Sequence, residues 1–272
     1  MMWTLNKSGT FEQNLERVVQ AGYHQVELVD EFRNWSKIDT RRIIARMRAL
    51  GITVDAMAGM ILGFADPTGG DGFISELKTL IPTAQRLGCG QIILLSGKRI
   101  ENAFASNQRS LNQDPDQQST QHLVSIETLR RAAQVLTDTD LVGVIEPIDH
   151  LENPSIYLDG VTEAFAIVRA VNSPAVRVLY DLYHEQRTHG NLIQKLEDNI
   201  EDVGLIHVAD VPGRHEPGTG EVNYDMVYRK LAQLKYKGTI AMEFYPTADL
   251  VTTLRSAREQ VARSFDSTAP IQ

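Results

Sequence analysis

Four residues that can bind a divalent cation stand at the ends of four successive apolar segments in the second half of the chain. They are Glu146 (in VIEPID), Asp181 (in VLYDLYH), His207 (in GLIHVAD) and Glu243 (in AMEFYP). If these segments are strands of one parallel barrel, their carboxyl ends meet at one rim and the side chains converge. Three converging carboxylates raise one another's pKa unless a cation compensates their charge. The pattern therefore predicts a divalent metal site, with a network of structural ion pairs as the alternative.

The donor set also indicates which metal to expect. Three carboxylates with one imidazole suit Mn²⁺ or Mg²⁺ best, and Zn²⁺ or Co²⁺ are the alternatives. A single Glu at a strand end commonly pairs with Lys or Arg, and a single His commonly lies in a core. The prediction therefore depends on the coincidence of four such residues at equivalent positions.

Short apolar segments alternate with longer amphipathic ones along the whole chain. The expected strands are 2–5, 25–29, 53–57, 91–95, 141–146, 176–181, 205–208 and 239–243. Several lack a polar alternation, as is typical of strands buried on both faces of a parallel sheet. Helical spacing of apolar residues predicts helices at 11–19, 40–50, 73–87, 123–135, 161–171, 192–199, 224–231 and 250–265.

Glycines follow four of these helices and suit left-handed helix C-termini: Gly22, Gly51, Gly88 and Gly238. Eight strand–helix units in 272 residues are typical of a (β/α)₈ TIM barrel, of the α/β class. A doubly wound open sheet is the competing fold, but the Gly-rich turn expected after its first strand is missing after Leu5. We expect one TIM-barrel domain over residues 1–272.

Composition excludes several classes of protein. The chain has 27 basic and 35 acidic residues, a net charge of −8, and a single cysteine. One cysteine permits neither an internal disulfide nor a Cys-rich zinc site. There is no signal-like N-terminus and no apolar run of about 20 residues. We expect a cytoplasmic protein without membrane or nucleic-acid partners, because nucleic-acid binding usually needs a basic face.

Two segments near the predicted rim could contact a substrate. His184 follows Asp181 closely in YDLYH, and the Pro- and Gly-rich segment 209–221 carries Arg214, His215 and Glu216. Such a stiffened loop beside a metal suits recognition of a carboxylate or of hydroxyls, and salt-bridged surface charges are the alternative.

Other polar segments follow the 91–95 strand. Lys98 and Arg99 are candidate anion contacts or a solvated basic pair. The polar segment 107–121 is interpreted as a mobile surface loop, with a lid or an oligomer contact as the alternatives. Trp3 and Trp35 could wall the pocket or fill the core.

The segments EPID, YDLYHEQ, GLIHVADVPGRHEPGTGEVNY and MEFYPT closely resemble the hydroxypyruvate isomerase family. That family belongs to the xylose isomerase-like TIM barrels, with sugar 3-epimerases and endonuclease IV as more distant relatives. The resemblance covers essentially the whole chain and is strongest over residues 144–246.

The resemblance implies a metal-dependent isomerase of a small hydroxy-keto acid or sugar. Its metal ligands would be Glu146, Asp181, His207 and Glu243. Glu146 and Glu243 would also act as catalytic acid and base, passing through a cis-enediolate from hydroxypyruvate to 2-hydroxy-3-oxopropanoate. The resemblance also implies that His184 and Arg214 contact substrate oxygens. Together with Glu216 and Lys98, which the sequence pattern alone suggests, they are the candidate substrate-binding residues. Family members are often homo-oligomers.

One departure from the family keeps the substrate open. Many hydroxypyruvate isomerases have Gln where His207 stands, whereas the sugar 3-epimerases typically have His. A 3-epimerase or isomerase of a non-phosphorylated ketose or cyclic polyol is therefore the alternative. A non-catalytic binding barrel is more remote. An endonuclease-like activity would need further metal ligands at 56–58 and 95–97, and these are missing.

Overall fold

The computed structural model describes residues 1–100 and 120–266, and within them a parallel sheet curls into a nearly closed barrel. Neighbouring strands pair in chain order. The strands are β1 (Gln25–Leu28), β2 (Thr53–Met57), β3 (Gln91–Leu95), β4 (Val142–Glu146), β5 (Val176–Asp181), β6 (Val203–Val208) and β7 (Thr239–Met242). Most of the predicted segment 107–121 lies outside the described residues. The predicted α/β, TIM-barrel-like fold is confirmed.

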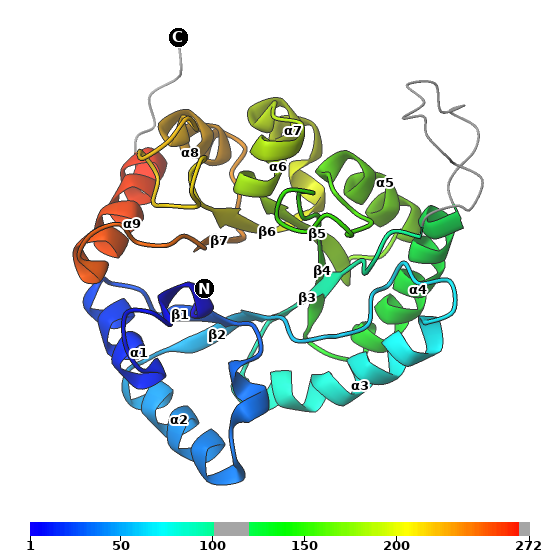
Figure 1. The fold of residues 1–272 in the computed structure, drawn as a ribbon, viewed down its shortest axis with the longest axis horizontal. Helices are drawn as coiled ribbons and strands as arrows, with labels where there is room; N and C mark the ends of the chain where they lie inside the picture. The colour runs from blue at the N-terminus through cyan, green and yellow to red at the C-terminus, as the bar shows by residue number, and fades with distance from the viewer. Residues whose placement is uncertain (101–119, 267–272) are drawn as a thin grey trace.

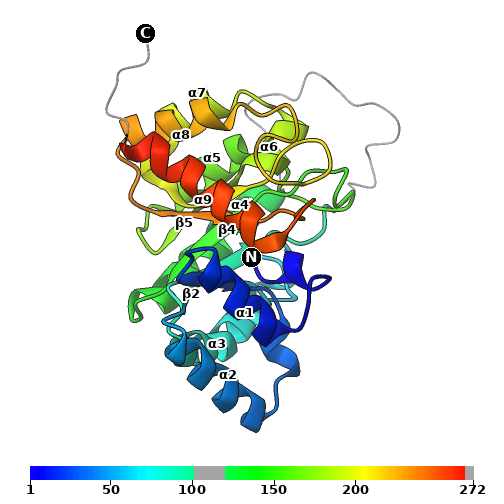
Figure 2. The same cartoon turned by 90° about the vertical axis from the view of Figure 1, so that its left-hand side faces the viewer.

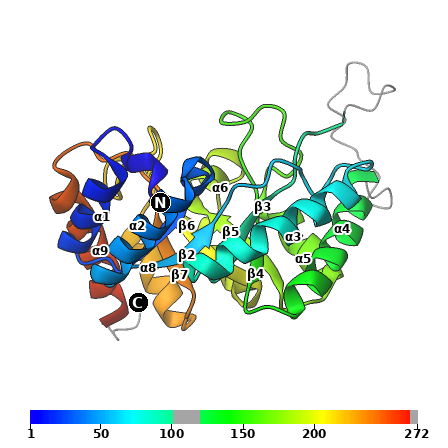
Figure 3. The same cartoon turned by 90° about the horizontal axis from the view of Figure 1, so that it is seen from below.

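Helices surround the sheet as an outer ring (Figure 1). They are α1 (Phe11–Gln20), α2 (Lys37–Ala49), α3 (Gly70–Leu87), α4 (Thr120–Thr137), α5 (Val161–Val171), α6 (Leu182–Thr188), α7 (Leu192–Asn199), α8 (Tyr224–Gln233) and α9 (Leu250–Asp266). Three 3₁₀ turns are η1 (Trp3–Leu5), η2 (Glu31–Asn34) and η3 (Ile200–Asp202). Helix α9 packs beside α1, which joins the two ends of the ring (Figure 2). Helices α3 and α4 lie at the far end of the molecule from them (Figure 3).

All eight predicted helices are present, and α6 is an additional one. It begins directly after β5 because the Asp181 side chain accepts hydrogen bonds from the backbone nitrogens of Tyr183 and His184. None of the helices in the described parts of the chain is long and apolar enough to cross a membrane.

The predicted strand at 2–5 is wrong, because these residues enter the 3₁₀ turn η1 instead. Only the first two residues bridge the sheet edges. The Met1 nitrogen donates to the Met242 carbonyl at 2.8 Å, and the Met2 nitrogen donates to the Glu27 carbonyl at 3.0 Å. The N-terminal residues therefore lie between β7 and β1 (Figure 1) without forming an eighth strand.

Local hydrogen bonds explain why this segment turns. The Thr4 hydroxyl donates to the Met1 carbonyl at 3.0 Å, and the Asn14 amide donates to the Leu5 carbonyl at 2.8 Å. These side-chain hydrogen bonds use backbone carbonyl groups that would otherwise pair with a neighbouring strand. They therefore favour the turn over a strand.

Three of the four predicted left-handed glycines are confirmed: Gly22, Gly51 and Gly88 have positive φ. Gly238 does not, and the left-handed residue after α8 is Lys235, with φ of 55°. Gly238 serves close packing instead, because a Cβ there would lie 2.3 Å from the Tyr236 hydroxyl.

The inside of the barrel explains why the predicted donors converge. A small apolar cluster fills it, made of Ala56, Ile93, Val144, Leu179, Leu205 and Ala241. The last four of these stand two residues before Glu146, Asp181, His207 and Glu243, respectively. Because side chains alternate between the two faces of a strand, each donor follows its apolar neighbour onto the inner face.

Candidate metal and active site

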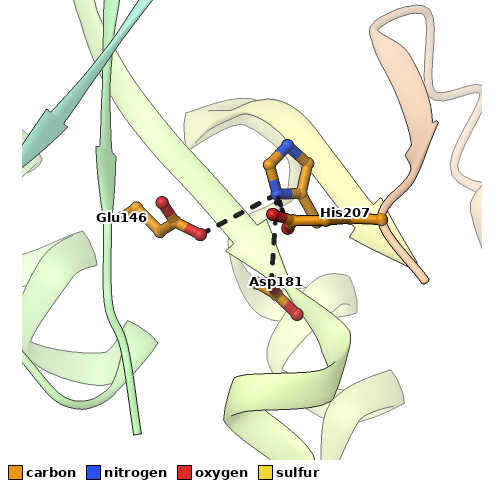
Figure 4. A group of neighbouring side chains, drawn as sticks. Glu146, Asp181 and His207 are labelled. Atoms are coloured by element: carbon orange, nitrogen blue, oxygen red, sulfur yellow. Dashed lines mark ion pairs between the residues drawn. The ribbon is translucent and has the colours of Figure 1, made fainter. Parts of the chain in front are cut away.

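The structure brings the four predicted donors together at the ends of β4, β5, β6 and β7. One ligand atom of each lies within 4.8 Å of the others, and all four residues are buried. His207 Nδ1 is 2.6 Å from Glu243 Oε2, 3.8 Å from Glu146 Oε1 and 3.9 Å from Asp181 Oδ2. Figure 4 shows the His207 ring facing Glu146 and Asp181. A single cation could therefore contact all four side chains.

Three buried atoms of this cluster, Asp181 Oδ2, His207 Nδ1 and Glu243 Oε2, have close charged neighbours but form no hydrogen bond. Buried polar atoms without a hydrogen bond are rare because each costs free energy. All three are atoms that can donate a lone pair to a metal, and they face one another. The residues therefore fit a divalent cation.

The two glutamates differ in their electrostatic environment in the metal-free protein. Burial raises the pKa of Glu146 to about 7, and the negative charge of Glu243 adds to this effect. Burial acts on Glu243 in the same direction, but the positive charges of His207 and Arg214 outweigh it and hold the pKa well below its usual range. The Glu146 carboxyl group thus titrates near neutral pH, whereas that of Glu243 is ionised there.

Arg214 lies at the edge of the cluster. Its Nη2 is 2.9 Å from Glu243 Oε2 and 3.5 Å from Asp181 Oδ2. The guanidinium lies between two aromatic rings, with centroids 5.4 Å away at Trp3 and 5.2 Å away at Tyr183. These cation–π contacts hold the guanidinium in place. Among the residues described, Arg214 is the only basic side chain of this loop that faces the four donors.

Asp210 organises the loop that carries Arg214. It is fully buried and accepts hydrogen bonds from four backbone nitrogens, those of Val211, Gly218, Gly220 and Val222. One carboxylate thus closes the loop on itself, and Arg214 adopts a left-handed backbone with φ of 58° within it. This role was not predicted, because Asp residues are frequent in loops and carry no specific signal.

His184 lies beside the cluster in the first turn of α6. Its Nδ1 is 2.6 Å from Asp149 Oδ2, and its Nε2 is 3.5 Å from Asp181 Oδ2. Burial alone would lower the pKa of His184, but the two aspartates outweigh burial and raise it. Asp149, which sequence reasoning missed, therefore fixes the orientation of this imidazole.

The two remaining candidates are placed differently. Glu216 accepts hydrogen bonds from the Thr247 nitrogen at 3.1 Å and from the Thr247 hydroxyl at 2.5 Å. Lys98 is exposed, and its backbone pairs with Ile156. Within residues 1–100 and 120–266, no hydrogen bond or ion pair joins either side chain to the four donors. Their predicted contact with substrate stays a prediction.

Two residues from the N-terminal part of the chain also reach the cluster. The Trp3 indole nitrogen donates to Glu243 Oε1 at 2.9 Å. Glu27 Oε2 lies 3.3 Å from His207 Nε2. Trp3 was among the candidates for a pocket wall, whereas the role of Glu27 was not predicted. The available signal was one charged residue that interrupts the apolar segment VELV.

Comparison with known proteins supports the resemblance seen in the sequence. A family described as xylose isomerase-like TIM barrel matches residues 15–265. The hydroxypyruvate isomerase of Escherichia coli is 34% identical over 134 residues, which cover 49% of this chain and 52% of that protein. The 2-oxo-tetronate isomerase of Cupriavidus necator is 34% identical over 123 residues, which cover 45% of this chain and 47% of that protein. The matched segment thus spans about half the length of each of these relatives.

Solved structures support the fold independently. The crystal structure of AP endonuclease, family 2, from Brucella melitensis matches with a TM-score of 0.76 and 23% sequence identity. The match covers 91% of this chain and 92% of that one. At this identity the likeness shows the fold alone.

Proposed function

Because this chain belongs to the xylose isomerase-like TIM-barrel family, we propose that it is a metal-dependent isomerase of a small hydroxy-keto acid. The observation that carries the proposal is the buried group of Glu146, Asp181, His207 and Glu243, delivered by four successive strands. TIM-barrel enzymes carry their catalytic residues at the carboxyl ends of the barrel strands, which is where these carboxylate and imidazole groups lie.

The four donors would hold Mn²⁺ or Mg²⁺, with Zn²⁺ or Co²⁺ as the alternatives. When bound, such an ion supplies a Lewis acid that polarises a carbonyl group. Glu146 and Glu243 move the proton between neighbouring substrate carbons, one removing it and either of them returning it. Their pKa values in the metal-free protein are displaced in opposite directions, which is the pattern expected of an acid–base pair.

The surrounding residues orient the substrate. His184, held through Nδ1 by Asp149, presents its Nε2 toward the cluster and can hydrogen-bond a substrate oxygen. Arg214 offers a fixed guanidinium that suits a carboxylate, since such pairs form two parallel hydrogen bonds. A short acid with a carbonyl and an adjacent hydroxyl would engage both groups.

Hydroxypyruvate is the substrate we propose first, with 2-hydroxy-3-oxopropanoate as the product. The support comes from the name of the Escherichia coli relative and from the position of Arg214 beside two donors. A 2-oxo-tetronate is the nearest variation, from the name of the second relative. The presence of His207 favours the second candidate, a 3-epimerase or isomerase of a free ketose.

A substrate panel tests these proposals directly. Metal-stripped protein would be reconstituted with Mn²⁺, Mg²⁺, Zn²⁺ or Co²⁺ and assayed with hydroxypyruvate, 2-oxo-tetronate and a set of ketoses. We expect activity on a short oxo acid that is lost on stripping and restored by a divalent ion. Turnover of ketoses alone would favour the epimerase. Failure of every ion to produce activity on any of these substrates would contradict the proposed function.

A further inference from the structure

We propose that Glu27 of β1 is a positioning residue that fixes the ring and the tautomer of His207 for metal binding. The inference deepens the proposed function, because it rests on the metal site of that proposal. It assigns a role in the site to a strand that contributes none of the four donors.

The contact between Glu27 and His207 lies on the side of the ring opposite the cluster. Glu27 Oε2 is 3.3 Å and Oε1 is 3.4 Å from His207 Nε2, so both carboxylate oxygens face one ring nitrogen. The other nitrogen, Nδ1, faces Glu146, Asp181 and Glu243. The imidazole thus bridges one carboxylate behind it and three in front.

Two basic groups lie near the Glu27 carboxylate: the His207 ring, 3.3 Å from Oε2, and the N-terminal ammonium of Met1, 4.0 Å from the same oxygen. Glu27 is only 2% exposed, and its Cα partner on β2 is Ala56, a member of the apolar cluster inside the barrel. A register shift between Val26 and Glu27 marks an irregularity of the strand at this position. The Cα partner of His207 on β7 is Ala241, also small and apolar. A buried carboxylate without a basic partner costs several kcal/mol. Of the two basic partners of Glu27, the His207 imidazole is the nearer one.

Hydrogen-bond chemistry then determines the tautomer. An ionised carboxylate only accepts hydrogen bonds, so the ring nitrogen that faces Glu27 must carry a proton. A histidine that binds a metal is neutral and carries one ring proton. With the proton on Nε2, the lone pair of Nδ1 is directed at the other three donors. Carboxylates that hold the second nitrogen of a metal-binding histidine raise metal affinity in this way.

Metal binding can be measured without a substrate, by titrating Mn²⁺ and following the free ion by electron paramagnetic resonance. Glu27→Ala should weaken Mn²⁺ binding about 10- to 100-fold. Glu27→Gln retains an acceptor oxygen and should recover part of this loss. The matched control is Glu185→Gln, because Glu185 is equally buried but pairs with Lys195 and the Val161 nitrogen. It should bind Mn²⁺ like the wild type.

A double-mutant cycle separates positioning from general destabilisation. In a His207→Gln background there is no imidazole tautomer to fix, so Glu27→Ala should weaken binding less than about threefold further. An equal loss in both backgrounds, or wild-type affinity in Glu27→Ala, would overturn the inference. If circular dichroism shows that Glu27→Ala is unfolded, Glu27→Gln in the same two backgrounds decides by the same criterion.

The outcomes also distinguish this inference from the proposed function. Wild-type protein that binds Mn²⁺ but isomerises none of the substrates would overturn the function and leave the role of Glu27 testable by binding. Wild-type protein that binds no Mn²⁺ at any concentration up to millimolar would overturn the metal centre and the inference together.

Discussion

The strands β4–β7 and the N-terminal residues 1–28 contribute to the same site in different ways. The four strands supply every member of the donor group found in the described residues, Glu146, Asp181, His207 and Glu243. The N-terminal part supplies Trp3, which donates to Glu243, and Glu27, which contacts His207. One half of the barrel thus carries the donors, and the other half holds two of them in place.

This division of roles shows how the repulsion among the crowded carboxylates of the site is reduced. Three carboxylates in one place repel one another, and in the described parts of the metal-free protein the positive charges of Arg214, His184 and His207 offset this repulsion. Trp3 and Glu27 bind the outer atoms of Glu243 and His207, so the inner atoms stay directed at the centre. Each of the following experiments tests one side of this division.

The largest effect is expected from the donor side. Glu243→Gln should lower kcat/KM about 10²- to 10⁴-fold, because the variant loses a proton acceptor while its shape is nearly unchanged. Steady-state assays with bound metal quantified in the same sample would measure this. Asp71→Asn on the exposed side of α3 is the control and should retain full activity. Full activity of Glu243→Gln with metal bound would refute its assignment.

The second effect concerns the loop that carries Arg214. Asp210→Ala leaves four backbone nitrogens without their acceptor. The Val222 hydrogen bond is buried and the other three are partly buried, and a buried donor without a partner costs about 1–3 kcal/mol. We expect a loss of roughly 3 kcal/mol or more in the free energy of unfolding, measured by urea denaturation. Asp210→Asn retains one acceptor oxygen and should lose less. Equal stability of wild type and Asp210→Ala would show that the loop does not depend on this carboxylate.

The third effect is a pH dependence of the metal-free protein. Burial raises the pKa of Glu146 from its ordinary value of 4.5 to about 7. The folded state therefore binds this proton more tightly than the unfolded state, and stability falls as the pH rises from about 4.5 to 7. Glu146→Gln has no such proton, so it should be more stable than the wild type at pH 8, by roughly 1–3 kcal/mol.

Thermal melts in the presence of a chelator would measure this difference at several pH values. The advantage of Glu146→Gln should shrink toward pH 5 and should reverse when a divalent ion is added, because the ion then favours the carboxylate. If Glu146→Gln is less stable than the wild type at pH 8 without metal, the prediction that burial and carboxylate repulsion destabilise ionised Glu146 is contradicted.

The smallest effect is expected from the supporting side. Trp3→Phe removes the indole donor of Glu243 but keeps an aromatic ring beside Arg214. One hydrogen bond to a charged group contributes about 1.5–3 kcal/mol, so we expect kcat/KM to fall at least tenfold. Trp35→Phe is the matched control, since Trp35 packs against Phe11. If both variants lose activity equally, Trp3 acts through the core and not through Glu243.

Much of this molecule follows from local sequence patterns. The strands that carry the donors, the helices between them and the donors themselves were predictable because strand ends, apolar spacing and side-chain alternation are local properties. The resemblance to hydroxypyruvate isomerases is confirmed at the level of the family. The single-domain interpretation and the roles of Lys98 and Glu216 stay predictions.

The sequence by itself determined which residues could bind a metal and that their strands would deliver them to one rim. Only the tertiary structure decided that residues 2–5 turn away from the sheet, that Glu27 lies behind His207, and that Asp210 closes the Arg214 loop. The contact of Glu27 joins residues 180 positions apart. The other two outcomes depend on particular side-chain hydrogen bonds that the apolar spacing does not reveal. Whether a lone Glu in an apolar strand faces solvent or an imidazole is decided by the neighbour that the barrel brings to it.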